Sequence, residues 1–589
     1  MGIMKHTLAS LSVIAAFSFS TNTLAEEKTT EIREPEAATG FQSKEARIAE
    51  KYMVVAANPY ASKAGQLMLS KGGSAVDAMI ATQLVLTLVE PQSSGIGGGA
   101  FILHYDKKSK ELITFDGRET APKGASPELF LDDSGNAVRW IEAVVGGRSV
   151  GVPGILHAFK SAHDKYGKLP WQTLFKPAIE LARDGFIVSP RLNMLLEKRL
   201  NPGLTKLSPA KEYFYPNGEA LKTGTLLKNQ PLANLYFKLA TQGIQAFYEG
   251  QNATQLIEAV QKSEIAPGTL ALSDLANYES KTRSAICTSY RVYKVCSMAP
   301  PSSGGIAVLQ MMKLLEPFEL GKYKANAPEA LHLFTQASRL AFADRDFYVA
   351  DPDFVKVPTN ELLNEQYLQG RSKLISEMDN HDFPVGDPTA GKLAYAMNDS
   401  YELPSTSHVS IVDADGNAIS MTSSIEMAFG STVMVNGYLL NNQLTDFALS
   451  PKSGDKWVAN RVEAHKRPRS SMAPVMVFNK DGSLKLVVGS PGGSRIINYV
   501  AQTLVGVLDW GLSPQAAIDL PKITNRNKYT TLEKGTELVG HVQFFEKKGH
   551  EVQIRDLNSG LHAIEIKGGH LVGGADPRRE GIALGESSE

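Results

Sequence analysis

The chain has 589 residues, a formal net charge of -1 and a hydrophobic content of 43%. By length alone it corresponds to roughly three to four domains, and its composition is that of an ordinary soluble globular protein. The near balance of 61 basic and 62 acidic residues argues against nucleic-acid binding as its main function.

Residues 1–25 have the pattern of a secretory signal peptide. Lys5 and His6 precede an apolar run at 8–19, and Thr23-Leu24-Ala25 offers a small-residue cleavage site. The alternative is an N-terminal membrane anchor. The apolar run is shorter than the ~20 residues that span a bilayer, and no other segment approaches that length. We therefore expect export without an anchor, to the periplasm or the extracellular space.

The chain between 61 and 347 mixes helical and strand patterns. Helices are expected at 61–71, 74–89 and 327–347, strands at 100–105 and 111–115, and a mainly helical region at about 170–278. Two cysteines, Cys287 and Cys296, flank a segment that reads as two strands around a tight turn. A disulfide across this hairpin is feasible in an oxidising compartment, and two free buried thiols are the alternative.

Residues 380–405 contain prolines and glycines without a sustained period, which indicates an exposed connector. After it, strands predominate. They are expected in a hairpin that begins at 406, then at 437–441, 475–478 and 484–488, and a helix is expected at 496–510. Strands on both sides of the connector, with helices before and after them, favour two halves of one layered body. Residues 406–589 are therefore not expected to form an independent domain.

Thr406 is the first residue of the hairpin that follows the connector. An Asp-Gly turn at Asp415-Gly416 separates its two strand-like runs. If the Ser405–Thr406 bond is cut, Thr406 carries a hydroxyl nucleophile and its own α-amino base, which is a recognised way to activate threonine. Position alone does not distinguish this from an ordinary strand threonine. The other motifs decide between the two interpretations.

Two glycine motifs in the first third of the chain have structural explanations. Residues 147–151 match the G-x-S-x-G elbow of serine hydrolases after a possible strand at 141–145, but a credible helix starts only at Ile155, and an elbow needs one directly after the serine. Residues 95–100 loosely match a dinucleotide loop, but they follow a helix and open a strand, the reverse of the required context. Close backbone packing explains these glycines better. The sequence has no HExxH, CxxC or Walker motif, so metal and nucleotide chemistry lack support.

Other polar and glycine-rich segments are better candidates for catalytic or ligand-binding residues. Residues 489–495 follow a strand and precede a helix, so the N–H groups of Gly492 and Gly493 can face a developing negative charge, although a plain strand-to-helix turn is the alternative. Arg118 could hold a carboxylate through two hydrogen bonds, or simply pair with Glu119 at the surface. Gln443 and Asp446 could face a charged ligand, or only cap a turn.

Taken together, these segments resemble the γ-glutamyltranspeptidase (glutathione hydrolase) family of N-terminal-nucleophile enzymes. The likeness covers nearly all of the chain after residue 25. It comprises 72–78, 94–99, the segment around Arg118, 152–154, 300–305, the Thr406 hairpin, 440–443, 469–472 and 489–495. Each motif alone is weak to moderate, but their shared order is specific.

The resemblance implies an α+β fold, a four-layer αββα sandwich of the N-terminal-nucleophile hydrolase type. A large fragment, 26–405, and a small catalytic fragment, 406–589, would arise by self-cleavage at Ser405-Thr406 and form a heterodimer. No cofactor and no metal are implied. The substrates would be glutathione and related γ-glutamyl compounds, with water, amino acids or dipeptides as acceptors.

The resemblance also implies roles for individual residues. Thr406 would be the nucleophile, Ser424 would orient it, and Gly492 and Gly493 would form the oxyanion hole. The donor's charged head would be held on two sides. Its α-carboxylate would contact Arg118, Ser470 and Ser471, and its α-amino group would contact Glu426, Gln443 and Asp446.

Two features depart from the family pattern. Glu426 is acidic where several members carry Asn, and the segment 448–467, which in some members forms a lid, is shorter, with Trp457 as a possible aromatic cover. The alternatives are a related acylase of the same fold that acts on a glutaryl-type group, and a secreted binding protein that does not process itself. A plain dicarboxylate has no amine for the acidic groups, and the intact Thr406 and Ser424 argue against a binding protein.

Overall fold

The computed structural model describes Met1 and residues 40–380, 383–393, 395–398 and 405–586. Apart from Met1, the predicted signal peptide lies outside the described residues. The described residues from Gly40 onward form one compact unit.

Two seven-stranded sheets form the centre of this unit, and neighbouring strands are antiparallel throughout both. The first sheet has the order β1 (Arg47–Ala49), β22 (His570–Ala575), β21 (His562–Lys567), β17 (Leu484–Gly489), β16 (Val475–Phe478), β9 (Tyr293–Ser297) and β8 (Ile286–Tyr290). The second has the order β23 (Ile582–Gly585), β2 (Met53–Ala56), β10 (Ser407–Val412), β11 (Ala418–Ser424), β3 (Gly99–Asp106), β4 (Glu111–Gly117) and β7 (Lys281–Ser284).

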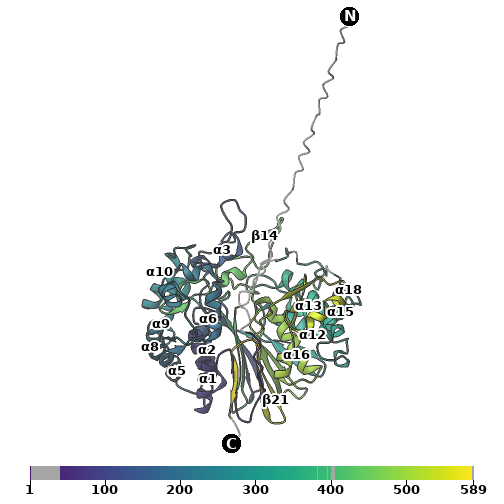
Figure 1. Cartoon of the computed structure of the whole chain (residues 1–589), viewed down its shortest axis with the longest axis horizontal. Coiled ribbons are helices and arrows are strands. Elements are labelled where there is room, and N and C mark those ends of the chain that lie inside the picture. Colours follow the sequence, from purple (N-terminus) through teal and green to yellow (C-terminus); the bar gives the residue numbers. More distant parts are fainter. Residues whose placement is uncertain (2–39, 381–382, 394, 399–404, 587–589) are drawn as a thin grey trace. The chain divides into compact units, whose positions relative to one another are not determined.

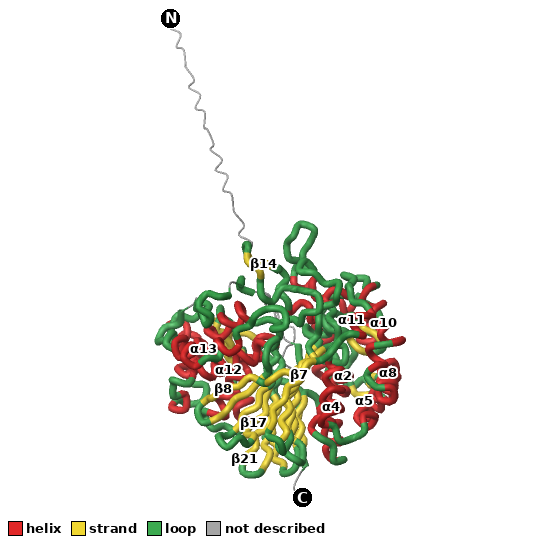
Figure 2. The backbone as a smooth tube through the Cα atoms, turned by 180° about the vertical axis from the view of Figure 1, so that it is seen from behind, coloured by secondary structure: helices red, strands yellow, loops and turns green. Residues whose placement is uncertain are grey.

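Helices cover the outer face of each sheet, so the unit has four layers (Figure 1). The second sheet is covered by α1 (Pro59–Ser70), α2 (Ala75–Val89) and α4 (Ile155–Tyr166). Outside these, α5 (Trp171–Asp184) packs on α2 and α8 (Gln230–Gln242) packs on α5, and α10 (Gly250–Gln261) lies farther out. The first sheet is covered by α12 (Ser303–Leu315), α13 (Pro328–Tyr348), α16 (Ile496–Leu508) and α17 (Pro514–Asp519). The view from behind shows the same sheets between the two helical layers (Figure 2). The predicted αββα sandwich is confirmed.

Shorter elements connect these layers. The remaining helices are α3 (Trp140–Val144), α6 (Pro190–Lys198), α7 (Ala210–Phe214), α9 (Gln245–Tyr248), α11 (Leu272–Ala276), α14 (Thr359–Leu362), α15 (Glu365–Ser372) and α18 (Val542–Lys547). A small three-stranded sheet is formed by β18 (Ile523–Asn525), β19 (Thr530–Glu533) and β20 (Val552–Arg555). Three two-stranded pairs are β5 (Phe186–Ile187) with β6 (Leu226–Leu227), β12 (Met434–Val435) with β13 (Tyr438–Leu439), and β14 (Lys452–Ser453) with β15 (Lys456–Trp457).

Both sheets combine strands from before and after Thr406. In the second sheet, β10 lies between β2, which comes from the start of the chain, and β11, which pairs with β3. In the first sheet, β16 joins β17 to the early strand β9. Because each segment supplies strands that the other must pair with, residues 406–589 do not form a separate domain.

The helix α2 shows how local sequence places an element behind β10. Ser74 caps it: the Ser74 hydroxyl accepts a hydrogen bond from Asp77 N at 3.2 Å, and the Asp77 carboxylate accepts one from Ser74 N at 2.8 Å. All fifteen residues of α2 are buried, which explains its mainly apolar sequence. The helix packs on β10 and β11 and so supports the strand that begins after Thr406.

Two strands expected from the sequence, at 141–145 and 437–441, differ from the structure. Of the strand expected at 141–145, residues 141–144 belong to helix α3, because a short, mainly apolar run does not distinguish the two structures. The strand expected at 437–441 is only two residues long. Ser149 is buried in a short 3₁₀ turn, its hydroxyl donates to Val144 O at 2.6 Å, and α4 begins at Ile155, so there is no nucleophile elbow.

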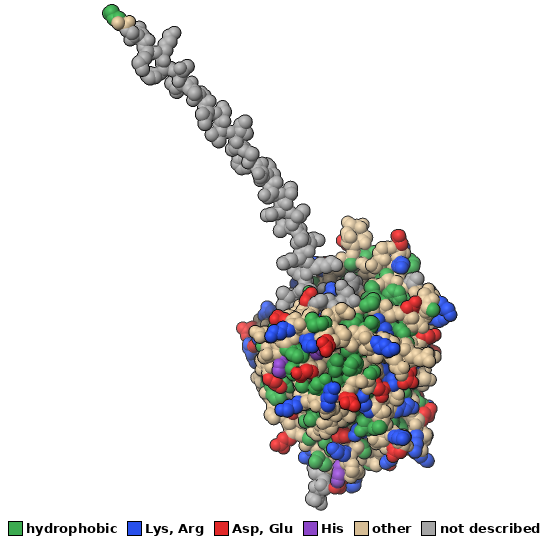
Figure 3. Space-filling view, turned by 90° about the vertical axis from the view of Figure 1, so that its right-hand side faces the viewer, with side chains coloured by type: hydrophobic (Ala, Val, Ile, Leu, Met, Phe, Trp, Pro, Cys, Tyr) green, Lys and Arg blue, Asp and Glu red, His purple; other side chains and the backbone are tan. Residues whose placement is uncertain are grey.

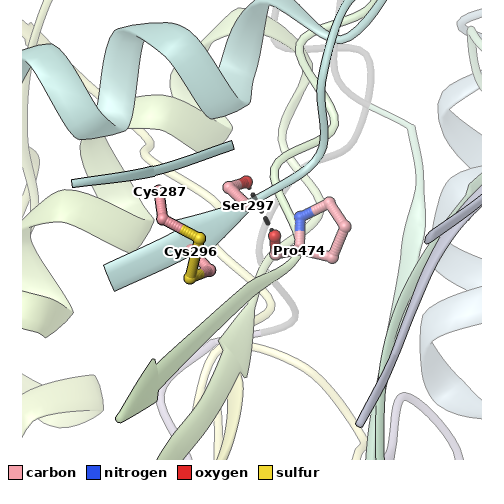
Figure 4. The surroundings of a disulfide bond; sticks show 4 residues. All are labelled: Cys287, Cys296, Ser297 and Pro474. Atoms are coloured by element: carbon pink, nitrogen blue, oxygen red, sulfur yellow. Dashed lines mark hydrogen bonds between the residues drawn. A yellow bond between two sulfur atoms is a disulfide. The ribbon is translucent and has the colours of Figure 1, made fainter. Parts of the chain in front are cut away.

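Cys287 and Cys296 lie directly opposite each other on β8 and β9 and form a disulfide (Figure 4). Next to it, the Ser297 hydroxyl donates to Pro474 O at 2.8 Å and ties β9 to the neighbouring strand. The hairpin expected between the two cysteines is present.

Three further observations concern surface charge, membrane-spanning helices and metal ligands. On the face drawn in Figure 3, basic and acidic side chains are interspersed, in line with the net charge of -1. Among the described helices, none has the length and apolar character needed to cross a bilayer. Within the same residues, no group of three or more His, Cys, Asp or Glu side chains is arranged to hold a metal ion.

Two buried histidines between the sheets predict loss of stability at acidic pH. His562 Nδ1 lies 2.8 Å from His408 O, and burial lowers the pKa of His562 to about 3 and that of His408 well below its usual value. In the unfolded chain these two histidines take up protons below pH ~6.5, whereas in the folded protein burial keeps them neutral. The free energy of unfolding therefore decreases as the pH falls from ~6.5 toward 3. At pH 4.5 each histidine lowers the free energy of unfolding by about 2–3 kcal/mol.

Denaturant unfolding at pH 7 and pH 4.5 measures this effect. The variant His562→Gln is expected to be less stable than the parent protein at pH 7 but to lose less on acidification, because one titrating group is gone. Equal losses in the parent and the variant would contradict the assignment.

Candidate active site

Thr406 directly precedes β10, an inner strand of the second sheet, and is buried while the chain is continuous. Its hydroxyl oxygen lies 2.6 Å from the carbonyl oxygen of Ser405, the peptide group that the predicted cleavage would break. The Ser405 side chain donates to Gln92 O, which fixes the residue on the other side of that bond. The nucleophile and its own peptide carbonyl are therefore held next to each other.

Ser424, at the end of β11, completes this arrangement. Its hydroxyl donates to Ser405 O at 2.8 Å, accepts from Glu426 N at 2.7 Å and lies 3.5 Å from the Thr406 hydroxyl oxygen. A donor on the Ser405 carbonyl oxygen stabilises the negative charge that develops there when the carbon is attacked. The pairing of β10 with β11 places the two residues together.

The glycines at 97 and 98 allow this strand end to pack closely. A Cβ atom on Gly98 would lie 2.1 Å from the carbonyl oxygen of Ser424, and one on Gly97 would lie 2.1 Å from that of Leu439. No other residue fits at that distance. The interpretation of these glycines as packing residues is confirmed.

Replacing Gly98 by alanine is expected to displace Ser424 and slow cleavage of the chain, and to cost about 1–3 kcal/mol of stability by overpacking. Gly370→Ala is the matched control: Gly370 is in α15 and has no atom within 4 Å of an added Cβ. This control should be neutral or stabilising by up to about 1 kcal/mol. Urea unfolding and a time course of cleavage measure both effects, and normal cleavage of stable Gly98→Ala would contradict the prediction.

Arg118 is the centre of a buried charged cluster. Its guanidinium contacts the carboxylates of Asp446 and, at 3.3 Å, Glu119, and it donates to Pro468 O at 3.1 Å and Arg469 O at 3.0 Å. Arg118 is 1% exposed, so the alternative of a surface arginine is wrong. The predicted cationic group and one member of the predicted acidic group thus lie side by side and pair directly.

The pKa values in this cluster reflect its burial. Burial raises the pKa of Glu119 to about 8, and the charge of Arg118 only partly opposes this. Burial also acts to lower the pKa of Arg118, but Asp446, Glu119 and Glu426 outweigh it, so its pKa lies above the usual value. Arg118 therefore stays charged and can hold a carboxylate.

Glu426 and Gln443 connect this cluster to Thr406. Glu426 has a left-handed backbone, φ 77°, and donates its N–H to Ser424. With its amide oxygen turned toward the same turn, Gln443 accepts from Glu426 N at 2.9 Å, and this oxygen lies 3.2 Å from Ser424 Oγ. Because Glu426 also acts on the pKa of Arg118, the two sides of the site are in electrostatic contact.

Ser470 and Ser471 follow directly after the Arg469 carbonyl that Arg118 contacts. Two hydrogen bonds hold the loop that contains these serines. Ser303 N donates to Ser470 O at 2.7 Å, and the Ser471 hydroxyl accepts from Arg345 at 2.6 Å. Arg345 also donates to the Ser303 hydroxyl at 2.9 Å. The two serines are therefore held rigidly beside Arg118.

Gly492 and Gly493 lie at the turn from β17 into α16, both with positive φ, 138° and 55°. Among the described residues, no hydrogen bond joins them directly to Thr406. Their link is indirect: Pro491 packs on Gly560, and Arg579, which also lies against Gly560, donates to Ser559 O at 3.2 Å and to Thr406 O at 3.5 Å. The oxyanion-hole role of the two glycines stays a prediction.

Comparison with known proteins agrees with this arrangement. A family model described as gamma-glutamyltranspeptidase matches residues 61–586. The chain belongs to the γ-glutamyltranspeptidase family. Among curated relatives, the glutathione hydrolase proenzyme of Bacillus subtilis (strain 168) is 38% identical and that of Escherichia coli (strain K12) is 37% identical; in each case 90% of this chain and 91% of the relative are covered.

A solved structure extends the likeness to three dimensions. The cephalosporin acylase of Bacillus halodurans is 28% identical, with a TM-score of 0.81, over 93% of this chain and 98% of that chain. The family and its N-terminal-nucleophile fold, identified from the ordered motifs, are thus confirmed.

Sequence reasoning missed three residues of the site: Glu119, Arg345 and Arg579. Glu119 was considered only as a surface partner of Arg118, although the acidic residue next to a buried arginine is a signal for a charged pair. Arg345 lies in the last turn of the long helix α13, where an arginine is typical of a helix end. Arg579 lies 173 residues after Thr406, and no local pattern connects the two.

Proposed function

We propose that this protein is a self-processing γ-glutamyltransferase and glutathione hydrolase with Thr406 as its nucleophile. One observation carries the proposal: the Thr406 hydroxyl oxygen lies 2.6 Å from the Ser405 carbonyl oxygen, while Ser424 donates to that oxygen at 2.8 Å. Family membership and the relatives named glutathione hydrolase proenzyme support the reaction class. Export to the periplasm or the extracellular space is part of the proposal and is supported by the signal pattern of residues 1–25 alone.

Processing would begin with attack of the Thr406 hydroxyl on the Ser405 carbonyl carbon. The negative charge on the carbonyl oxygen is stabilised by Ser424, and the C–N bond breaks to leave an ester between Ser405 and the Thr406 hydroxyl. The hydroxyl proton moves to the leaving nitrogen, which becomes the free α-amino group of Thr406. Water then hydrolyses the ester, which releases the Ser405 carboxylate and restores the Thr406 hydroxyl. An α-amino group has a pKa of ~7.7–8, so it can act as the base for the same hydroxyl near neutral pH.

Recognition of the donor would use the charged cluster. A γ-glutamyl group carries an α-carboxylate and an α-ammonium on one carbon, so its site needs a cation and acids side by side. Arg118 with Ser470 and Ser471 would hold the carboxylate, and Asp446, Glu426 and Gln443 would hold the ammonium. Ser424 contacts Glu426 and Gln443, and so places the head at a fixed distance from Thr406.

Turnover would then follow two half-reactions. Thr406 attacks the γ-amide of the donor and releases the amine, which for glutathione is cysteinylglycine, leaving a γ-glutamyl ester. Water or the amino group of an amino acid or dipeptide then takes the γ-glutamyl group and restores Thr406. Gly492 and Gly493 would donate their N–H groups to the oxyanion in both steps, each donor contributing roughly 2.7–4 kcal/mol.

An acylase that acts on a glutaryl-type group is the second candidate, because one solved neighbour, with a TM-score of 0.81, is a cephalosporin acylase. A glutaryl group has the same carbon chain and terminal carboxylate but no amine. The carboxylates of Asp446 and Glu426 around Arg118 favour the γ-glutamyl donor, since a plain dicarboxylate would leave them without a cationic ligand group.

The first test is a denaturing gel of the purified protein with N-terminal sequencing of each band. We expect two bands, the smaller one starting Thr-Ser-His-Val. A γ-glutamyl anilide and a glutaryl anilide assayed side by side then separate the two activities. A single band from folded, inactive protein would overturn the proposal, and faster release from the glutaryl anilide would favour the acylase.

A further inference from the structure

A cavity lies at the open edge of the two-sheet sandwich, apart from the Thr406 site. Its volume is about 950 Å³, and it is lined by β4, by the edge strands β7 and β8, by β9, and by the turn between β16 and β17. Both cysteines, Cys287 and Cys296, are part of its wall. None of the residues used in the proposed reaction lines it.

The charge of this cavity is strongly positive. Its wall includes Lys110, Lys165, Lys294 and Lys480, and none of these four lysines forms an ion pair with any residue that the structure describes. Among the described residues that line the wall, Glu111 is the one with an acidic side chain. Two arginines also line it, but they pair with aspartates outside the wall. A small anion is therefore attracted into the cavity.

The disulfide and one of the lysines face the same way. Cys287 pairs with Cys296 and Ser289 pairs with Lys294, two residues further along each strand. Because side chains two apart on a strand point to the same face, the Lys294 ammonium group lies on the disulfide's side of the hairpin. Cys287 is partly exposed and Cys296 is 1% exposed, so the Cys287 sulfur is the one a solvent molecule reaches first.

We propose that this cavity binds low-molecular-weight thiols that carry carboxylates and that these thiols exchange with the Cys287–Cys296 disulfide. The thiol first loses its proton to solvent. Its thiolate attacks the Cys287 sulfur, a new S–S bond forms, the old one breaks, and Cys296 leaves as a thiolate that takes a proton from water. The number of disulfides is unchanged by this step.

The lysines would promote this reaction in two ways. They raise the local concentration of the anionic thiolate, and Lys294 stabilises the departing Cys296 thiolate. Glutathione, with two carboxylates and one ammonium group, belongs to this class of thiols. The inference does not rest on the proposed γ-glutamyl activity, because it concerns a separate cavity.

The test compares thiols of opposite charge on the oxidised protein. Exchange rates of 3-mercaptopropionate and 2-mercaptoethylamine are measured by acid quench, alkylation and mass spectrometry, and each rate is divided by the rate of the same thiol with an unstructured disulfide peptide. Neither probe is a γ-glutamyl compound. Because the chain has two cysteines, every adduct reports on this disulfide.

We expect the normalised rate of 3-mercaptopropionate to exceed that of 2-mercaptoethylamine about tenfold at low ionic strength, and the ratio to fall toward one at high salt. Lys294→Gln and Lys480→Gln should each lower the ratio, and the exposed Lys71→Gln, outside the cavity, should not. Equal normalised rates for the two thiols, or an unchanged ratio in both cavity variants, would overturn the proposal. So would the absence of any adduct on the folded protein.

Discussion

Replacing Thr406 by alanine is expected to leave one uncut chain with no measurable γ-glutamyl transfer. The variant lacks the hydroxyl that lies 2.6 Å from the Ser405 carbonyl oxygen, so neither the ester nor the new N-terminus can form. By analogy with removal of other catalytic nucleophiles, we expect kcat to fall by about 10⁴-fold or more. A denaturing gel and an assay with a γ-glutamyl anilide measure the two losses.

Thr406→Ser is the matched control for this variant. Serine keeps the hydroxyl and, after cleavage, the α-amino base, so the chain should still be cut and remain active, although more slowly. Thermal unfolding of both variants checks that the sheets have formed. Cleavage at the same bond in Thr406→Ala, or activity of its uncut chain, would contradict the assignment of Thr406.

Replacing Asp446 by asparagine is expected to give the second-largest loss. The amide oxygen can still accept from Arg118, but the negative charge that would face the donor's ammonium group is gone. Losing a buried charged partner typically costs about 2–5 kcal/mol, so kcat/KM for a γ-glutamyl anilide should fall at least about 30-fold. The effect should appear mainly in KM, and cleavage of the chain should proceed.

The same variant separates the two candidate activities. A glutaryl anilide has no ammonium group, so Asp446→Asn should leave its rate unchanged or raise it, and the preference for the γ-glutamyl donor should shrink. Asp133→Asn, at an exposed position in a segment distant in sequence from Asp446, is the control and should change neither rate. Equal losses with both anilides would show that Asp446 acts on the structure of the site and not on the amine.

The parts of the fold that local sequence determines were predicted well. The hairpin that follows Thr406 has alternating apolar residues and an Asp-Gly turn, and β10 and β11 are found there. The capped helix α2 was predicted within one residue of its start. In contrast, the short, mainly apolar segment 141–145 has no cap or turn that distinguishes a helix from a strand, and most of the strand predicted there belongs to helix α3.

The site was predictable where a motif or family pattern names the residue, and not where distant segments meet. Arg118 and Asp446 were both expected to contact the substrate, and the structure adds that they pair with each other across 328 residues. Arg345 contacts Ser471 from 126 residues away, and that contact exists only because α13 packs beside the 470–471 loop. No periodicity in the sequence carries such information.

The position of Arg579 bears on when the cut can occur during the life of the chain. Arg579 contacts the carbonyl of Thr406 from 173 residues further on, and β23, which follows it, lies beside β2, the neighbour of β10. A polypeptide still emerging from the ribosome has Thr406 long before it has these segments. Self-cleavage would therefore wait for synthesis of the C-terminal strand, and a prematurely terminated product would stay in one inert piece. In this way self-cleavage would be restricted to chains that have been translated to the end.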